Sequence, residues 1–286
     1  MDRTATFEAH RPRLTRLAYR MLGSVAEAED AVQDAWLRWS GAGEDIADPE
    51  GWLVRATSRL CIDRLRAAKV RREAYRGPWL PEPLIEELTA DPVERAEDVS
   101  IAFLLALERL SPLERAVFLL HDVFDEDYAS VAETLGRSEA AVRQLASRAR
   151  SHVKDTRPRF SVSQEEVSRL AMAFMAAASN GDVAALNELL AEDAVMITDG
   201  GGKRKASLRP LIGREDVLRL LQGLAWREAE PYAALELKPV RINGYFGVIL
   251  VREDGPATVA FEPGPDGKLK GIYMVRNPDK LGHLPA

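Results

Sequence analysis

The chain has 286 residues, which at about 150 residues per domain predicts two domains or three small ones. Hydrophobic residues make up 46% and charged residues 29%, a globular composition that excludes a disordered, collagen-like or membrane-embedded chain. The formal net charge of −6, from 39 basic and 45 acidic residues, by itself argues against a nucleic-acid partner.

The predicted elements begin with a helical region from about residue 7 to 75. Ser24 and Glu27 have the spacing of a capping box, and Gly41 follows where that helix ends. Asp48 and Pro49 suit the N-cap and first turn of a second, long helix. Apolar residues recur at helical spacing: Ala28, Val32, Ala35, Trp36 and Trp39 in the first helix, then Trp52, Leu53, Ala56, Leu60 and Leu65. We therefore expect an all-α domain over residues 1–76.

Residues 77–98 break this helical pattern. They hold seven acidic residues, the single base Arg95, and four prolines at positions 78, 81, 83 and 92. This composition is typical of a linker, in which short helical turns can form. A second helical domain is expected over residues 99–159, with a helix from Ile101 to Leu110. Ser111, Pro112 and Glu114 then combine a capping box with a proline at the first helical position.

The segment from Tyr128 to Arg150 has the spacing of a helix-turn-helix. Ala132 is small where the helices cross, Gly136 suits a left-handed turn, and Ser138 can cap the second helix. The residues expected to face the core are Val142, Leu145 and Ala149. Those expected to face outward are Glu139, Arg143, Gln144, Ser147, Arg148 and Arg150. The outward set suits base readout in the DNA major groove and phosphate contacts, and an ordinary helical hairpin is the alternative.

Residues 160–286 change from helices to strands. Ser163 and Glu166 form a capping box, with apolar residues at positions 167, 170, 171, 174, 175 and 178. Further helices are expected from Asp182 through Leu190 and near residues 214–224. Four runs have strand composition: Ala234–Ile242, Tyr245–Arg252, Ala257–Phe261 and Leu269–Arg276. This order predicts an α+β domain with a curved antiparallel sheet.

The net charge is unevenly spread along the chain. Between Trp52 and Arg76 eight bases face two acids, a net charge of +6, and between Arg137 and Arg159 seven bases face two acids, a net charge of +5. Because the whole chain carries −6, the other residues carry −17. Two basic segments in an acidic chain suit a localised phosphate-binding surface, although a solvated helix face explains each one equally well alone.

Two helix surfaces before the linker carry further candidate binding residues. Helical spacing gathers an acidic and amide stripe, consisting of Glu29, Asp30, Gln33, Asp34 and Leu37, which taken alone is better explained as a solvated face. In the first basic segment Trp52 stands among arginines, and such surfaces bind unstacked bases and their phosphates. Trp52 is equally suited to a core position.

Together these motifs resemble those of extracytoplasmic-function (ECF) sigma factors. The resemblance rests on Asp30–Ala35 (DAVQDA), on Trp52–Leu53 followed by Asp63–Arg66 (DRLR), and on the helix-turn-helix ending in Ser147–Arg150 (SRAR). It covers residues 1 to about 157 as sigma domain 2, a linker and sigma domain 4.

The resemblance implies a site for each step of promoter recognition. The acidic stripe would dock on the clamp helices of the RNA polymerase β′ subunit, and domain 4 would meet the β flap. The melted −10 element would be read by the loop from about Ser40 to Pro49 and by Trp52, Arg55, Arg59 and Arg66. The −35 element of the promoter DNA would be read by Arg143, Gln144, Ser147, Arg148 and Arg150. Many members have asparagine on the −10 helix where this chain has Arg59.

Three more segments resemble signatures of the ECF subgroup with a fused C-terminal SnoaL-like domain, group 41 or sigma-J type. They are Trp79, Leu80, Pro81, Glu82 and Pro83; Asp199, Gly200, Gly201, Gly202 and Lys203; and Asn277, Pro278, Asp279, Lys280 and Leu281. The subgroup implies a multidomain fold, with two all-α sigma domains and a cone-shaped, NTF2-like α+β barrel over residues 160–286. That barrel would act in cis, in place of a separate anti-sigma factor, through contacts with the sigma domains and the linker.

The C-terminal domain offers little for catalysis. His283 is the only histidine after residue 152, Asp193 and Asp199 are isolated carboxylates, and the glycine loop at 199–203 lacks P-loop spacing, so a contact turn is favoured. We expect a sigma factor rather than an enzyme, without metal or cofactor. The alternatives are a DNA-binding regulator with a small effector and a barrel with hydrolase or cyclase activity, and an unidentified small-molecule ligand stays open.

The single cysteine and the N-terminus indicate the compartment. Cys61 alone cannot form an internal disulfide or a cysteine-rich zinc site, which fits a reducing environment. The first residues lack the apolar core of a signal peptide, and the sequence has no run of about 18 apolar residues. We therefore expect a cytoplasmic protein without membrane contact.

Overall fold

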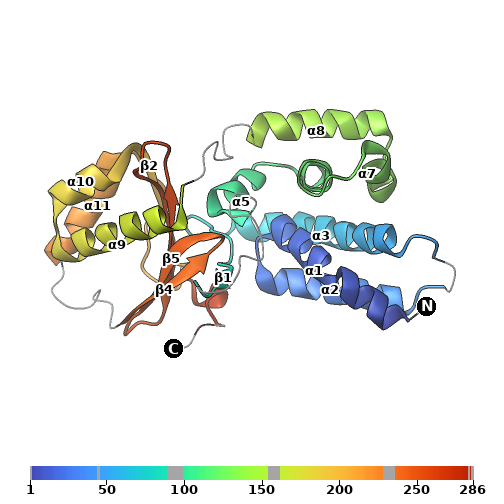
Figure 1. Ribbon diagram of the computed structural model, residues 1–286, viewed down its shortest axis with the longest axis horizontal. Helices are drawn as coiled ribbons and strands as arrows, with labels where there is room; N and C mark the ends of the chain where they lie inside the picture. Colours follow the sequence, from blue (N-terminus) through green and yellow to red (C-terminus); the bar gives the residue numbers. More distant parts are fainter. Residues whose placement is uncertain are drawn as a thin grey trace. The chain divides into compact units, whose positions relative to one another are not determined.

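The computed structural model describes residues 2–43, 46–88, 99–153, 162–227, 236–282 and 284. The chain folds into two compact units (Figure 1). The first unit joins Met1–Ala74 to Phe103–Arg157, and the second joins Tyr75–Ala102 to Pro158–Ala286. The segment between the two helical regions thus belongs to the same unit as the C-terminal part of the chain.

Three helices form the N-terminal part of the first unit: α1 (Arg3–Leu22), α2 (Val25–Ser40) and α3 (Pro49–Glu73). The Ser24 hydroxyl accepts a hydrogen bond from the Glu27 amide at 3.2 Å, and Gly41 caps the end of α2, as predicted. The Asp48 carboxylate caps α3 by accepting from the Gly51 amide at 3.0 Å. The side of α2 that packs inward consists of Ala28, Ala31, Val32, Ala35 and Trp39.

The rest of the first unit consists of α5 (Ile101–Leu107), α6 (Pro112–Phe118), the π-helix η1 (Leu119–Val123), α7 (Tyr128–Leu135) and α8 (Glu139–Val153). The capping box of Ser111 and Glu114 forms in both directions, as predicted. Helix α5 ends at Leu107 rather than Leu110, because the Leu110 amide bonds to the Leu107 carbonyl and tightens the last turn. The two helical parts are joined by buried Arg115 of α6, which donates to the Met21 carbonyl at 2.7 Å.

Helices α7 and α8 form the expected helix-turn-helix. Gly136 has φ +62° and closes α7, and the Ala141 amide donates to Ser138 at 3.3 Å. The side of α8 that packs inward differs slightly from the expectation. Ala146 is fully buried together with Val142 and Ala149, whereas Leu145 is half-buried, because the helical repeat of 3.6 residues puts Ala146 opposite α6 and α7.

The second unit packs three helices on one side of a seven-stranded sheet (Figure 1). The helices are α9 (Gln164–Asn180), α10 (Val183–Leu189) and α11 (Arg214–Arg227). The strands, in spatial order, are β1 (Ile85–Glu86), β4 (Glu236–Ile242), β5 (Tyr245–Val251), β6 (Ala257–Pro263), β7 (Leu269–Val275), β2 (Leu190–Asp199) and β3 (Leu211–Ile212). A short helical turn, η2 (Pro278–Lys280), follows β7. The four predicted strands are present as β4 to β7.

The four predicted strands pair antiparallel, as expected, but the sheet also contains a parallel pair. Strand β2 pairs with β7 in parallel, and Leu190 begins this strand rather than ending α10. The register shifts between Leu190 and Val195, and the exposed acids Glu192 and Asp193 lie in that irregular stretch. Those charges interrupt the apolar alternation that would identify a strand. The linker also contains a strand, β1, which pairs with β4.

The core of the second unit lies between its helices and the sheet. Phe174 of α9 packs edge-on against Phe261 of β6, with ring centroids 5.8 Å apart. The same cluster includes Val167, Ala171, Leu186, Met196, Val217, Phe246, Val248 and Ile272. Side chains from the helices and the sheet therefore form one apolar cluster.

Candidate functional site

The acidic stripe lies together on the surface of α2. Glu29, Asp30 and Gln33 are exposed, Asp34 is half-buried, and the Leu37 side chain is 59% exposed. Arg64 of α3 pairs with Asp34 at 2.5 Å and lies 3.9 Å from Asp30, so it neutralises part of the stripe. What stays accessible is an exposed leucine bordered by carboxylates, a combination that suits a protein partner.

The four candidate residues on α3 have different surroundings. The Trp52 ring packs against Trp39 with centroids 5.4 Å apart and is half-buried, so it contributes to the core as well as the surface. Arg55 pairs with Glu133 of α7 at 2.7 Å, and Arg59 donates from Nε to the Thr134 carbonyl at 3.3 Å. Two of the expected DNA-binding arginines are thus held by α7.

Arg66, the fourth candidate on α3, is exposed and lies one helical turn from Asp63, with which it pairs at 3.0 Å. Such a short-range surface pair constrains the guanidinium weakly. Arg66 therefore has the accessibility that a phosphate contact needs.

A polar cavity of about 260 Å³ lies beside the contact between α3 and α7. Arg13 of α1 lines it and pairs with both Glu50 of α3 and Glu126, the residue before the N-cap of α7. Its lining includes the Arg55 and Glu133 pair. Exchangeable ion pairs therefore link the N-terminal helices to the helix-turn-helix.

The expected outward face of α8 is exposed at every position named for it. These positions are Glu139, Arg143, Gln144, Ser147, Arg148 and Arg150. Three of the arginines are paired at short range: Arg143 with Glu139 at 2.7 Å, Arg148 with Glu114 at 3.3 Å, and Arg150 with Asp122 at 2.6 Å. The Arg143 and Glu139 pair is exposed on both sides and is therefore weak, so an incoming anion can replace the carboxylate. The carboxylates that pair with Arg148 and Arg150 are only 12% and 17% exposed, so those two arginines are held more firmly.

Tyr128, the first residue of α7, also contacts this face. The Arg143 guanidinium lies 4.6 Å from the centroid of its ring, and Arg150 donates to its hydroxyl at 3.1 Å. Sequence reasoning used Tyr128 only as the start of the motif. An aromatic residue opening the first helix of a basic helix-turn-helix is the signal that could have indicated this contact.

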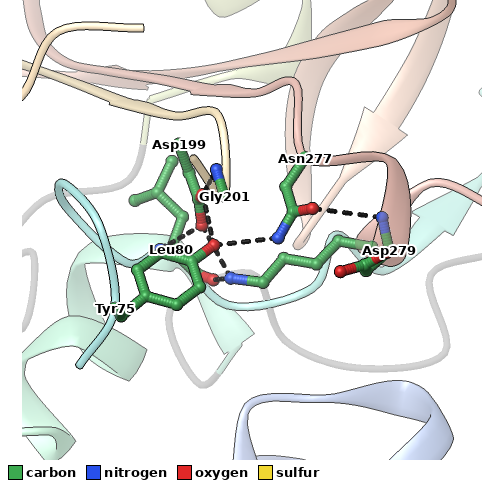
Figure 2. A network of polar contacts seen from close by, with 7 residues as sticks. Tyr75, Leu80, Asp199, Gly201, Asn277 and Asp279 are labelled. Atoms are coloured by element: carbon green, nitrogen blue, oxygen red, sulfur yellow. Dashed lines mark hydrogen bonds and ion pairs between the residues drawn. The ribbon is translucent and has the colours of Figure 1, made fainter. Parts of the chain in front are cut away.

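Asp199 holds the start of the linker against the C-terminal part of the chain (Figure 2). Its side chain is fully buried, although the sequence suggested an isolated carboxylate. It accepts hydrogen bonds from the Tyr75 hydroxyl at 2.5 Å, the Leu80 amide at 2.9 Å and the Gly201 amide at 2.9 Å, and it pairs with Lys280 at 2.7 Å. That expectation was wrong, because sequence separation hid the donors that surround the carboxylate.

Lys280 and Asn277 complete this cluster. The Lys280 ammonium also donates to the Leu80 carbonyl and lies 4.3 Å from the centroid of the Trp79 ring. Asn277 donates to the Tyr75 hydroxyl at 2.8 Å and accepts from the Asp279 amide at 3.1 Å. Burial and the bond to Asp199 raise the pKa of Tyr75, so its hydroxyl keeps its proton. The structure therefore brings parts of all three signature segments together in one buried network.

The glycine loop serves close packing. Gly201 has φ +62°, and a Cβ there would lie 2.3 Å from Cγ of Asn277. The Gly200 carbonyl accepts from the amides of Lys203 and Arg204, and the Lys203 ammonium pairs with Asp279 at 2.6 Å. Gly202 lies beside the Arg76 side chain. The loop's own contacts thus favour a contact turn over a phosphate cradle.

The remaining residues of the three signatures are mostly buried or partly buried. Leu80, Pro81, Glu82, Pro83 and Leu281 are buried, and Trp79 and Pro278 are half-buried. This burial shows that residues 79–83, at the start of the linker, are closely packed.

A second set of hydrogen bonds holds the linker at Asn243, in the turn between β4 and β5. Asn243 has φ +50° and is buried, and its backbone amide donates to the Leu84 carbonyl at 2.9 Å. Its side chain accepts from the Leu84 amide at 3.1 Å and donates to the Val99 carbonyl at 2.9 Å. Sequence reasoning missed this residue, since Asn-Gly indicates a hairpin turn but not what the turn contacts.

The two candidate carboxylates, Asp193 and Asp199, pair with different lysines, Lys270 and Lys280. Asp193 is exposed and lies 3.3 Å from Lys270, and His283 is outside the described residues. A buried pair was missed: the Tyr273 hydroxyl donates to Glu262 at 2.8 Å. It lies on the sheet face opposite the apolar core, since Phe261 and Ile272, the neighbours in sequence, belong to that core. Burial raises the pKa of Glu262 from 4.5 to about 7.

Neither a metal site nor a membrane-spanning helix is found among the described residues. In the part of the chain that the structure describes, no three histidine, cysteine or acidic side chains are grouped to hold a metal ion. Within those same residues, no helix has the length and apolar content needed to cross a membrane.

Comparisons with known proteins match both helical regions and the full length of the chain. Residues 6–71 match the model of Sigma-70 region 2, and residues 100–153 match that of Sigma-70, region 4. The ECF RNA polymerase sigma factor SigJ of Mycobacterium tuberculosis is 41% identical over 297 aligned residues, which cover 98% of this chain and 93% of that protein. The probable ECF sigma factor SigI of the same species is 40% identical over 193 residues, or 65% of this chain and 66% of that protein.

A solved structure agrees with this relationship. The crystal structure of M. tuberculosis SigJ matches with a TM-score of 0.80 and 39% sequence identity, and the match covers 99% of each chain. The likeness therefore includes the C-terminal α+β domain as well as the two helical regions. This chain belongs to the family of extracytoplasmic-function RNA polymerase sigma factors.

Proposed function

We propose that this chain directs core RNA polymerase to specific promoters and that its C-terminal domain controls this activity in cis. The buried Asp199 network is the observation that carries the second part. It ties Tyr75 and Leu80, at the start of the linker, to Lys280 near the end of the chain. A linker held in this way limits the separation that the two promoter-binding regions can reach.

The polymerase-binding surface of the proposal is the stripe on α2. Glu29, Asp30, Gln33 and Asp34 supply carboxylates and an amide, and Leu37 supplies an apolar contact, for the clamp helices of the β′ subunit. Region 4 would meet the β flap. The accessible Leu37 side chain, 59% exposed beside acidic groups, supports this assignment. Because the polymerase works in the cytoplasm, we place the protein there.

Promoter recognition would require a rearrangement of the first unit. Trp52, Arg55, Arg59 and Arg66 are assigned to the −10 element, but Arg55 and Arg59 are bound by α7. The α8 residues Arg143, Gln144, Ser147, Arg148 and Arg150 are assigned to the −35 element. Separation of α3 from α7 would free the two arginines, so the compact state is the less active one.

The free energy needed for such control is modest. A difference of a few kcal/mol between compact and open states changes the population of the active state by orders of magnitude. Contacts on the linker can therefore set activity without any ligand. An effector that binds the C-terminal domain would act through the same difference in free energy, and nothing in the described residues identifies one.

Transcription with purified components tests the proposal. The full chain, core polymerase and a promoter selected from a randomised library should give specific transcripts. The double variant D30N/D34N should lose core binding while keeping its helix content, and N180D, at the exposed end of α9, serves as a control. A D30N/D34N protein that binds core normally would refute polymerase docking through α2, and would favour a DNA-binding regulator of another kind.

A further inference from the structure

We propose that Tyr128 is a positioning residue for promoter recognition, which orients Arg143 and Arg150 before DNA binds. The inference rests on the proposed role of α8 at the −35 element. Tyr128 directly follows Asp127, whose carboxylate caps α7 by accepting from the Ser130 amide at 2.7 Å. The start of α7, and with it the Tyr128 backbone, is therefore fixed.

One face of the Tyr128 ring is covered by His121. The two rings are stacked, with centroids 3.9 Å apart and planes inclined by 29°. His121 is itself held, because its Nδ1 lies 2.7 Å from the Glu126 carbonyl oxygen. A carbonyl only accepts hydrogen bonds, so Nδ1 carries the proton and donates. The tyrosine ring consequently lies on a supported surface.

The other face of the ring is available to Arg143. Its guanidinium carbon lies 4.6 Å from the ring centroid, and since His121 occupies one face at 3.9 Å, the arginine takes the opposite one. This is cation–π geometry. Glu139 holds the same guanidinium from one turn earlier on α8, at 2.7 Å. Arg143 is therefore directed by two groups, one from each helix of the motif.

The hydroxyl of Tyr128 holds the second arginine. Arg150 donates from Nη2 to this hydroxyl at 3.1 Å and from Nε to Asp122 at 2.6 Å. A single side chain from α7 thus contacts arginines that are seven positions apart on α8 and lie on the same helical face. An arginine that is already ordered loses less conformational entropy when it binds a base or phosphate.

The burial of Tyr128 also indicates that it positions the arginines rather than forming the core of the motif. The core of the motif is formed by Val131, Ala132, Val142, Ala146 and Ala149, which are buried, whereas Tyr128 is only half-buried. Loss of the ring should therefore change the arginines more than the fold. Phenylalanine would keep the stacking surface for Arg143 and lose only the contact with Arg150.

The test compares Y128L, Y128F and R143A in the full-length protein bound to core polymerase. The probe is double-stranded DNA carrying the −35 sequence that the wild-type holoenzyme selects from a randomised library, alongside single-base substitutions of it. We expect R143A to lose discrimination at one or two base pairs. Y128L should reduce discrimination at those same positions by about five-fold, the size expected for one ordered side chain. Y128F should keep that discrimination and weaken all sequences together by about two-fold.

The control is A129S, an exposed neighbour on α7, which should leave discrimination unchanged. In the R143A background, Y128L should have no further effect at the affected base pairs, as coupled residues require. If R143A loses discrimination at particular base pairs but Y128L weakens binding to every sequence equally, Tyr128 has only a structural role and the inference is overturned. If R143A changes no base preference, the proposed −35 role of α8 fails instead.

Discussion

The charged groups of α8 and those around Asp199 differ in their burial and in the partners that neutralise them. Arg143, Arg148 and Arg150 are exposed, and the carboxylates that pair with them are between 12% and 48% exposed. Asp199 is buried, and its partners are the nearby Gly201 amide together with an amide, a phenol and an ammonium from distant parts of the chain. The first arrangement suits binding that must exchange partners, and the second suits a contact that must hold.

The energetics of burial explain this contrast. An exposed ion pair contributes about 0–1 kcal/mol, because water and salt screen it. Breaking a buried pair costs about 3–5 kcal/mol, since the remaining charge is left without a partner. The linker contact should therefore contribute more to stability than the surfaces assigned to DNA do.

The largest effect is expected for D199A. Removal of this carboxylate leaves the partly buried Lys280 ammonium without its ion-pair partner and should lower the unfolding free energy of the second unit by about 3–5 kcal/mol. Urea unfolding of the variant and of the wild-type protein measures the difference. D193A, which removes an exposed carboxylate, should change stability by about 0.5 kcal/mol or less. Equal effects of D199A and D193A would show that the buried carboxylate contributes no more to stability than the exposed one.

A pH dependence is expected from Glu262. Burial raises its pKa from 4.5 to about 7, so the folded state holds the proton more tightly than the unfolded state. The stabilisation is therefore complete below pH 4.5 and is lost as the pH rises to about 7, by about 3 kcal/mol in total. Urea unfolding at pH 5 and pH 8 should show this loss. E262Q should abolish this contribution, whereas E192Q, at an exposed strand position, should retain it. A pH dependence that is the same in both variants would contradict the assignment.

Alanine substitutions at two glycines with similar backbone angles distinguish the cost of backbone strain from the cost of a steric clash. Gly201 has φ +62°, and a Cβ there would lie within 2.5 Å of Asn277, whereas Gly267 has φ +72° and nothing within 4 Å of that position. G267A should cost about 1 kcal/mol from backbone strain alone. G201A should cost about 2 kcal/mol more, because Asn277 must move away from Tyr75. Thermal unfolding of the two variants measures the difference, and equal melting temperatures would show that the loop repacks freely.

The sequence predicts those parts of the fold that depend on neighbouring residues. The caps at Ser24, Ser111 and Ser163 form as expected, and the four hairpin strands occupy the expected ranges. The helix-turn-helix and its exposed face are confirmed, and the comparisons confirm the family. These features are local, since a capping box spans four residues and a strand pattern repeats every two.

The parts that could not be predicted depend on distant partners. Asp199 lies 124 positions from Tyr75 and 119 from Leu80. No local pattern shows that a carboxylate so far away will be buried by those donors. Strand β2 was missed because its partner β7 runs parallel and is distant in sequence, and the acids at its irregular start hide the alternation. The contact of Tyr128 with Arg143 likewise needs the two helices to be packed first.

The smallest expected effect concerns the exposed pair between Arg55 and Glu133. The pair holds an arginine assigned to the −10 element against α7, and 67% of the Glu133 side chain is exposed. E133A should change the unfolding free energy by less than about 1 kcal/mol. It should nevertheless raise the affinity of the holoenzyme for promoter DNA by about two-fold, because Arg55 no longer has to break its ion pair with Glu133 before it contacts DNA.

Measuring DNA affinity at several salt concentrations distinguishes the release of Arg55 from a general loss of negative charge. Added salt screens the Arg55 and Glu133 pair, so the gain from E133A should shrink as ionic strength rises. E8A also removes one exposed carboxylate, but Glu8 pairs with Arg11, one turn away on the same helix and outside the residues assigned to DNA. It should therefore raise DNA affinity less than E133A does. Equal gains from the two variants would mean that net charge matters and that α7 does not compete with DNA for Arg55.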